Sequence, residues 1–165
     1  MEATFEVGDK AYYPVHGVAE VVAVESRDIG GNATDVYVLK VVDTGLKIMV
    51  PKSNAKSVGL RTIMSEKDVG EVFSILASAD GAIDTQTWNR RYREYMEKIK
   101  TGSAFEIAEV LRDLYRLRTS KELSFGERRM METARGLLVK EIALARDTTE
   151  GDIEREIDAL FPAAA

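Results

Sequence analysis

Apolar and polar residues alternate with a period of two along the first sixty positions. Strands are predicted at 10–14, 18–26, 35–42 and 46–50, because each run is rich in Val, Ile or aromatic residues. Turn signals separate these runs, and the clearest is the glycine pair followed by asparagine at 30–32. Strands this short and this numerous predict a small, strongly bent barrel of the SH3 or Tudor kind.

The last predicted strand has two different faces. Leu46, Ile48 and Val50 share the buried face, whereas Met49 points the other way. Pro51 then ends the strand, because proline has no N–H to donate to a ladder. An outward apolar residue beside such a proline can dock against another protein's sheet edge. The alternative is an ordinary outer face of a small barrel.

The spacing of apolar residues becomes helical after residue 61. Helices are predicted at 65–78, 87–100, 103–119, 124–146 and 149–162, with a loop at 78–84. Four of the starts carry Ser or Thr with an acidic residue three positions later, which satisfies free N–H groups of the first turn; the pairs are Ser65/Asp68, Ser103/Glu106, Ser124/Glu127 and Thr149/Asp152. The predicted fold is therefore α+β with two domains, a β domain at 1–64 and an all-α domain of about five helices at 65–165.

The charge of the chain is unevenly distributed. The total of 23 Lys and Arg against 28 Asp and Glu gives −5, which alone argues against a nucleic-acid partner. Residues 85–135, however, carry 12 basic against 8 acidic side chains, a local charge of +4, between acidic flanks. A local patch decides binding to phosphates. The alternative is a solvated helix surface with pairs such as Glu94–Lys98.

The chemistry expected of an enzyme is missing from the sequence. There is no cysteine, and the single histidine, His16, lies in a predicted turn. Ser53 and Lys56 match an S-x-x-K pattern but follow a strand and lack partner motifs. No phosphate-binding glycine loop occurs. We therefore predict no enzymatic activity, no metal and no cofactor. No apolar run has the ~20 residues that cross a bilayer, and the acidic first residues do not resemble a signal peptide, so we expect a cytoplasmic protein with no membrane partner.

One constellation could contact DNA. Trp88, the only tryptophan, stands at a predicted helix start and is followed by Arg90, Arg91 and Arg93. Arginines at a helix start suit phosphate contact, and a flat ring beside them could wedge at an unstacked base step. The alternative is that Trp88 lies above Tyr92 and Tyr95 on one helix face and belongs to the core.

These residues resemble the CarD/CdnL family of RNA polymerase-binding regulators over nearly the whole chain. The resemblance is carried by FEVGDKAYYPVHGVAEV, by VP followed by GLR, by WNRRYREYMEKIKTGSAFEIAEVLRDLYRLR and by LSFGERRMMETARGLLVKEIALA. It implies a Tudor-like domain that binds the polymerase β subunit, through positions matching Arg27, Met49 and the adjacent Pro51. It also implies that Trp88 wedges into the minor groove at the upstream edge of the promoter bubble, with Arg90, Arg91 and Arg93 as basic contacts.

The sequence and the resemblance together predict a monomeric transcription regulator. It would bind the RNA polymerase β subunit and promoter DNA, the latter weakly and within the polymerase complex, and would associate with the nucleoid through the polymerase. Docking by the β domain would concentrate the helical domain at the promoter, so that it stabilises the open complex. The alternative function is a protein–protein adaptor of the transcription machinery that does not contact DNA.

Overall fold

The computed structural model describes residues 4–78, 88–120 and 122–161, except the side chains of Ile29, Trp88, Asn89 and Ser120. The chain divides into two compact units, residues 1–63 and 64–165. The predicted boundary, between residues 64 and 65, lies one residue further along. The backbone N–H of Met64 donates to Glu141 Oε2 at 2.8 Å. The α+β, two-domain fold class is confirmed.

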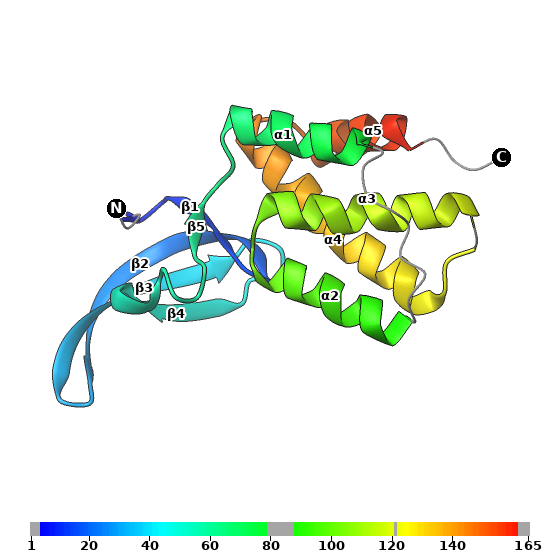
Figure 1. Ribbon diagram of the computed structural model, residues 1–165. Helices are drawn as coiled ribbons and strands as arrows, with labels where there is room; N and C mark the ends of the chain where they lie inside the picture. The colour runs from blue at the N-terminus through cyan, green and yellow to red at the C-terminus, as the bar shows by residue number, and fades with distance from the viewer. Residues whose placement is uncertain (1–3, 79–87, 121, 162–165) are drawn as a thin grey trace. The chain divides into compact units, whose positions relative to one another are not determined.

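The first unit is an antiparallel sheet with the strand order β4-β3-β2-β1-β5 (Figure 1). The strands are β1 (Lys10–Tyr13), β2 (Gly17–Ile29), β3 (Asn32–Val41), β4 (Lys47–Pro51) and β5 (Arg61–Thr62), with a short 3-10 helix η1 (Lys52–Asn54) after β4. The predicted closure into a barrel is wrong. Within residues 4–63, β4 and β5 form opposite edges with three strands between them, so the sheet is open.

Strands β2 and β3 extend beyond their predicted ends and meet in a tight hairpin. Their pairing continues to Ile29 and Asn32 on either side of Gly30-Gly31. Both glycines have positive φ, 60° and 85°, as a two-residue hairpin turn requires. Such a turn keeps the right-handed twist of the two strands, so the ladder can continue to the turn itself.

The core of the first unit lies on one face of the sheet. Its buried side chains are Phe5, Ala11, Ala19, Val21, Tyr37, Leu39, Val50, Ala55 and Leu60. Phe5 meets Tyr37 edge-on with ring centroids 5.6 Å apart, and its N–H donates to the Tyr37 hydroxyl. The edge-on geometry suits the opposite charge of a ring's edge and face.

The second unit contains the helices α1 (Glu66–Ala77), α2 (Trp88–Lys100), α3 (Ala104–Ser120), α4 (Phe125–Ala145) and α5 (Glu150–Leu160). Helix α3 contacts α1, α2 and α4, so it lies in the middle of this unit (Figure 1). Ser65 and Ser124 form full capping boxes with Asp68 and Glu127, as predicted. The predicted loop at 78–84 falls, from residue 79 on, outside the described residues. No helix of the described chain is long and apolar enough to cross a membrane.

Candidate functional site

Arg27, Met49 and Pro51 lie on one face of the sheet. Val36 on β3 is paired with Glu25 on β2 and with Pro51 on β4, so these three side chains form one cross-strand row. Met49 lies two residues before Pro51, and Arg27 two residues after Glu25. Because side chains alternate along a strand, all of them point to the same side. We call this side, opposite the Phe5 core, the outer face.

The outer face combines apolar and charged chemistry. Met49 is 52% exposed, whereas Val36 and Val38 beside it on β3 are buried. The Arg27 guanidinium donates to Glu25 Oε2 through two nitrogens, at 2.6 and 3.0 Å. An exposed ion pair of this kind is worth only about 0–1 kcal/mol. It therefore orients the guanidinium without preventing its exchange onto a partner's carboxylate.

The start of α2 presents its arginines in two different ways. Arg90 and Arg93 are exposed. Arg91 is buried, and its NH1 lies 3.3 Å from Glu127 Oε2 on α4. Arg91 therefore contributes to the contact between two helices, and this geometry does not favour it as a phosphate contact. Trp88 is the first residue of α2, and the position of its side chain lies outside the described residues.

A second basic and aromatic group stands on the first turns of α4. Phe125 is 72% exposed, and Arg128 and Arg129 are exposed as well. Because Arg91 pairs with Glu127, the first turns of α2 and α4 lie side by side, as Figure 1 shows. Sequence reasoning missed this group. The signal was available in the Ser124 capping box, which makes Phe125 the first helical residue, where no preceding turn covers it.

The cations further along α4 have acidic partners. Arg135 pairs with Glu154 and Asp158 on α5, and Lys140 pairs with Glu150. Arg146 pairs with Glu156 on α5 and with Glu66, the first residue of α1, and its guanidinium lies 5.0 Å from the Phe73 ring centre. Among the described residues no acidic side chain pairs with Arg90, Arg93, Arg128 or Arg129. We call these four the unpaired cations.

The environment of Arg135 holds it in place. Desolvation alone would lower its pKa, but the hydrogen bond to Asp158 and the neighbouring Tyr115 and Glu154 raise it above the ordinary arginine value. Burial in turn raises the pKa of the Tyr115 hydroxyl, against the opposing effect of Arg135. This arginine is therefore a charged member of an internal network.

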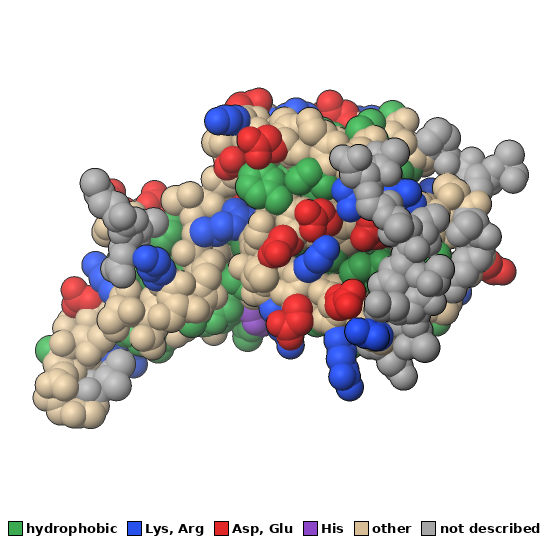
Figure 2. All heavy atoms as spheres, viewed as in Figure 1, with side chains coloured by type: hydrophobic (Ala, Val, Ile, Leu, Met, Phe, Trp, Pro, Cys, Tyr) green, Lys and Arg blue, Asp and Glu red, His purple; other side chains and the backbone are tan. Residues whose placement is uncertain are grey.

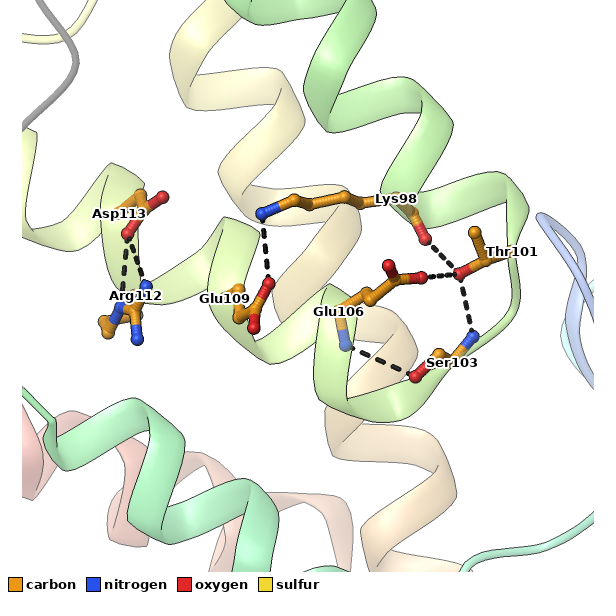
Figure 3. Close-up of polar contacts among 7 residues, drawn as sticks. All are labelled: Lys98, Thr101, Ser103, Glu106, Glu109, Arg112 and Asp113. Atoms are coloured by element: carbon orange, nitrogen blue, oxygen red, sulfur yellow. Dashed lines mark hydrogen bonds and ion pairs between the residues drawn. The ribbon is translucent and has the colours of Figure 1, made fainter. Parts of the chain in front are cut away.

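The end of α2 is fixed by a polar network that differs from the predicted capping box (Figure 3). Ser103 Oγ accepts the N–H of Glu106, as predicted, at 3.4 Å. The Glu106 carboxylate, however, accepts from Thr101 Oγ1, and the Ser103 N–H donates to that same hydroxyl. Lys98 pairs with Glu109 of α3 at 3.0 Å rather than with Glu94 as the solvated-surface alternative supposed. Helix α2 is thus attached to α3 at its end and to α4 at its start.

The surface over α2 and α3 carries both signs of charge. In Figure 2, Asp and Glu side chains are scattered over these helices, and Lys and Arg side chains project at the side of α2. No group of three or more potential metal ligands occurs among the residues that the structure describes.

Comparison with known proteins divides the chain into the same two parts as the structure does. The model of the CarD-like/TRCF RID domain matches residues 5–64, and the model of the CarD C-terminal domain matches residues 71–158. The chain belongs to the CarD/CdnL family. It is 29% identical over 150 residues to YdeB of Bacillus subtilis (strain 168), a proposed transcription factor, covering 91% of this chain and 97% of that one. The solved structure "CdnLNt from Myxoccoccus xanthus" is 44% identical and covers 40% of this chain and 93% of that chain, with a TM-score of 0.33.

Membership of the CarD/CdnL family makes this chain a transcription factor of the type that interacts with RNA polymerase. The first unit matches the RID module, whose family interacts with RNA polymerase. The second unit matches the CarD C-terminal domain and contains the unpaired cations. Each unit therefore presents its own candidate surface.

Proposed function

We propose that the chain binds the RNA polymerase β subunit through the outer face of its sheet and stabilises the open promoter complex through the starts of α2 and α4. The observation that carries the proposal is the contrast among cations. Arg90, Arg93, Arg128 and Arg129 are exposed and unpaired in the described chain, while the cations facing α5 have acidic partners. Unpaired arginines can contact phosphates and release counterions.

The outer face supports the first half of the proposal. Met49 offers an exposed, adaptable thioether, and Pro51 offers a rigid ring at the end of β4. Arg27 offers a guanidinium beside them. Interfaces are enriched in Met and Arg at their energetically important positions, so the three side chains are suited to a protein partner.

The unpaired cations support the second half of the proposal, which concerns promoter contact. Arg90 and Arg93 come from α2, and Arg128 and Arg129 come from α4. We assign phosphate contact to these four and a positioning role to Arg91, which revises the contact set drawn from the sequence. Phe125 adds an exposed ring that can pack on sugar or base. Trp88 is proposed as the wedge at the upstream edge of the bubble.

The proposed mechanism is a tethered contact. Docking of the sheet on the polymerase raises the local concentration of the helical unit at the promoter, so weak DNA contacts suffice in spite of a total charge of −5. The contacts favour the open complex only to the extent that they are stronger there than in the closed complex. One copy of the chain, without metal or nucleotide, is sufficient for this mechanism.

The rival function is an adaptor that binds other proteins and does not contact DNA. Position 88 is one helical turn before Arg91, whose side chain is buried. In this rival function the indole is part of the helical core. Because Trp88 is the only tryptophan, quenching of its fluorescence by a soluble quencher separates the two functions directly.

The outer face is tested by Met49→Ala and Arg27→Ala in the full chain. Each should weaken binding to the isolated β subunit by about tenfold, as expected for a contact worth more than 1 kcal/mol, and leave the circular dichroism spectrum unchanged. Val7→Ala is the control, because Val7 is exposed but lies outside the strands. Unchanged affinity in both variants would remove the outer face from the interface.

The wedge is tested by Trp88→Ala. Loss of base stacking worth about 1–3 kcal/mol should shorten the lifetime of the open promoter complex by about ten- to a hundredfold. The melting temperature of the free protein should hardly change. If the indole is a core residue, the loss should instead cost about 3–5 kcal/mol of folding free energy. A large drop in melting temperature with a normal open complex would establish the adaptor.

A further inference from the structure

The buried carboxylate of Glu127 has two tasks at once. It is 1% exposed and is the third residue of α4. Its Oε1 accepts the N–H of Ser124 at 2.9 Å, which completes the capping box. Its Oε2 lies 3.3 Å from NH1 of Arg91. The group that caps α4 is therefore the same group that anchors the start of α2.

Burial at the start of α2 is concentrated on Arg91 among the described side chains. Between residues 90 and 94 only Arg91 is buried, and the next buried residues, Tyr95 and Ile99, lie one and two turns further along. The contact is a buried ion pair, and moving the helix turn away would leave both charges buried without compensation, which is costly in free energy. The ion pair thus fixes the direction of the helix turn from which Arg90 and Arg93 project.

We propose that Glu127 is a positioning residue that holds the first turn of α2 in the orientation required for promoter contact, acting through Arg91. The inference rests on the proposed function for its DNA part, and on the geometry of the second unit alone for its positioning part. Without the ion pair, the first turn of α2 would populate several orientations. Its apparent affinity for the promoter would then fall in proportion to the fraction of competent chains.

The test uses Glu127→Gln in the full chain. Glutamine keeps the size of the side chain, and its amide oxygen can still accept the Ser124 N–H of the capping box. It removes the negative charge that faces Arg91. The matched control is Glu141→Gln on the same helix. Glu141 is also 1% exposed and accepts a backbone N–H, from Met64, but it lies fourteen positions further along α4.

Fluorescence anisotropy of Trp88, the only tryptophan of the chain, measures the order of this turn in the free protein. We expect the anisotropy to fall in Glu127→Gln and to keep its wild-type value in Glu141→Gln. Arg91→Lys, which retains the charge but not the fork of the guanidinium, should give an intermediate value and remains a folded test if Glu127→Gln does not fold. Wild-type anisotropy in both Glu127→Gln and Arg91→Lys would overturn the positioning role, as would an equal fall in the Glu141→Gln control.

The lifetime of the open promoter complex then tests the link to function. A competent fraction of about one tenth should shorten it about tenfold in Glu127→Gln but not in Glu141→Gln. A fall in anisotropy with an unchanged lifetime would leave Glu127 as the residue that positions α2, and would count against DNA contact by that helix. The failure of the two proposals can therefore be told apart.

Discussion

The two ends of α4 carry similar residues with opposite availability. At its start, Arg128 and Arg129 are exposed and make no ion pair with the described chain, and Phe125 is exposed beside them. Near its end, Arg146 pairs with acids from two other elements. Arginine content alone does not identify a phosphate-binding surface. The distribution of acidic partners shows which arginines are left available, and it explains how a chain with a net charge of −5 can present a local cationic surface.

The largest predicted effect comes from removing the four unpaired cations, compared with removing four cations that have acidic partners. Replacing Arg90, Arg93, Arg128 and Arg129 together by Gln should reduce the slope of log affinity against log salt by about three to four, since each phosphate contact contributes about 0.9. The measurement is promoter binding by the complex with polymerase over a range of salt.

The matched control for that variant replaces Arg135, Lys140, Arg146 and Arg155, which changes the total charge by the same amount. These cations have intramolecular partners, so the salt slope should stay at the wild-type value. Equal changes in the two variants would mean that total charge, rather than the unpaired cations, governs promoter binding.

A second prediction compares a buried ion pair with an exposed one. Arg91→Ala removes the cation facing Glu127 in a buried site, and such a loss costs about 3–5 kcal/mol. Arg146→Ala removes a partly exposed cation and should cost about 0.2–1 kcal/mol for the ion pair, with a further contribution from its contact with Phe73. Urea denaturation of the two variants gives both values. Similar costs would show that burial does not distinguish the two ends of α4.

The sequence predicted the elements better than it predicted their partners. Period and capping identified α1 and α4 because Ser65 and Ser124 act within a single turn of chain. The closure of the sheet was wrong, because β5 contains two residues and pairs with β1 about fifty positions away in the chain. Local patterns contain no information about such a distant pairing.

The candidate site shows the same limit. The arginines following Trp88 were identified as a group, yet Arg91 differs from its neighbours through a glutamate thirty-six positions later. Phe125 was overlooked because an aromatic residue in a helix is usually buried. The strand pattern indicated an outward docking residue at Met49, whereas the choice of the polymerase β subunit as partner, and of Arg27 as a contact, came from the resemblance to the CarD/CdnL family.

The smallest predicted effect concerns Asp152, in the first turn of α5. Hydrogen bonds from Thr148, Thr149 and Arg155 lower the pKa of Asp152 below its ordinary value. A carboxylate whose folded pKa is lowered contributes stability above its unfolded pKa and loses it as pH falls through the folded pKa. The contribution of Asp152 should therefore be complete above about pH 4 and disappear below it.

Asp152→Asn should flatten the acid limb of the stability curve in that range alone. Thr148→Val, which keeps the carboxylate but removes its strongest donor, should raise the Asp152 pKa in a carboxyl NMR titration. If Asp152 titrates at its ordinary value in the wild type, α5 begins without help from this charge.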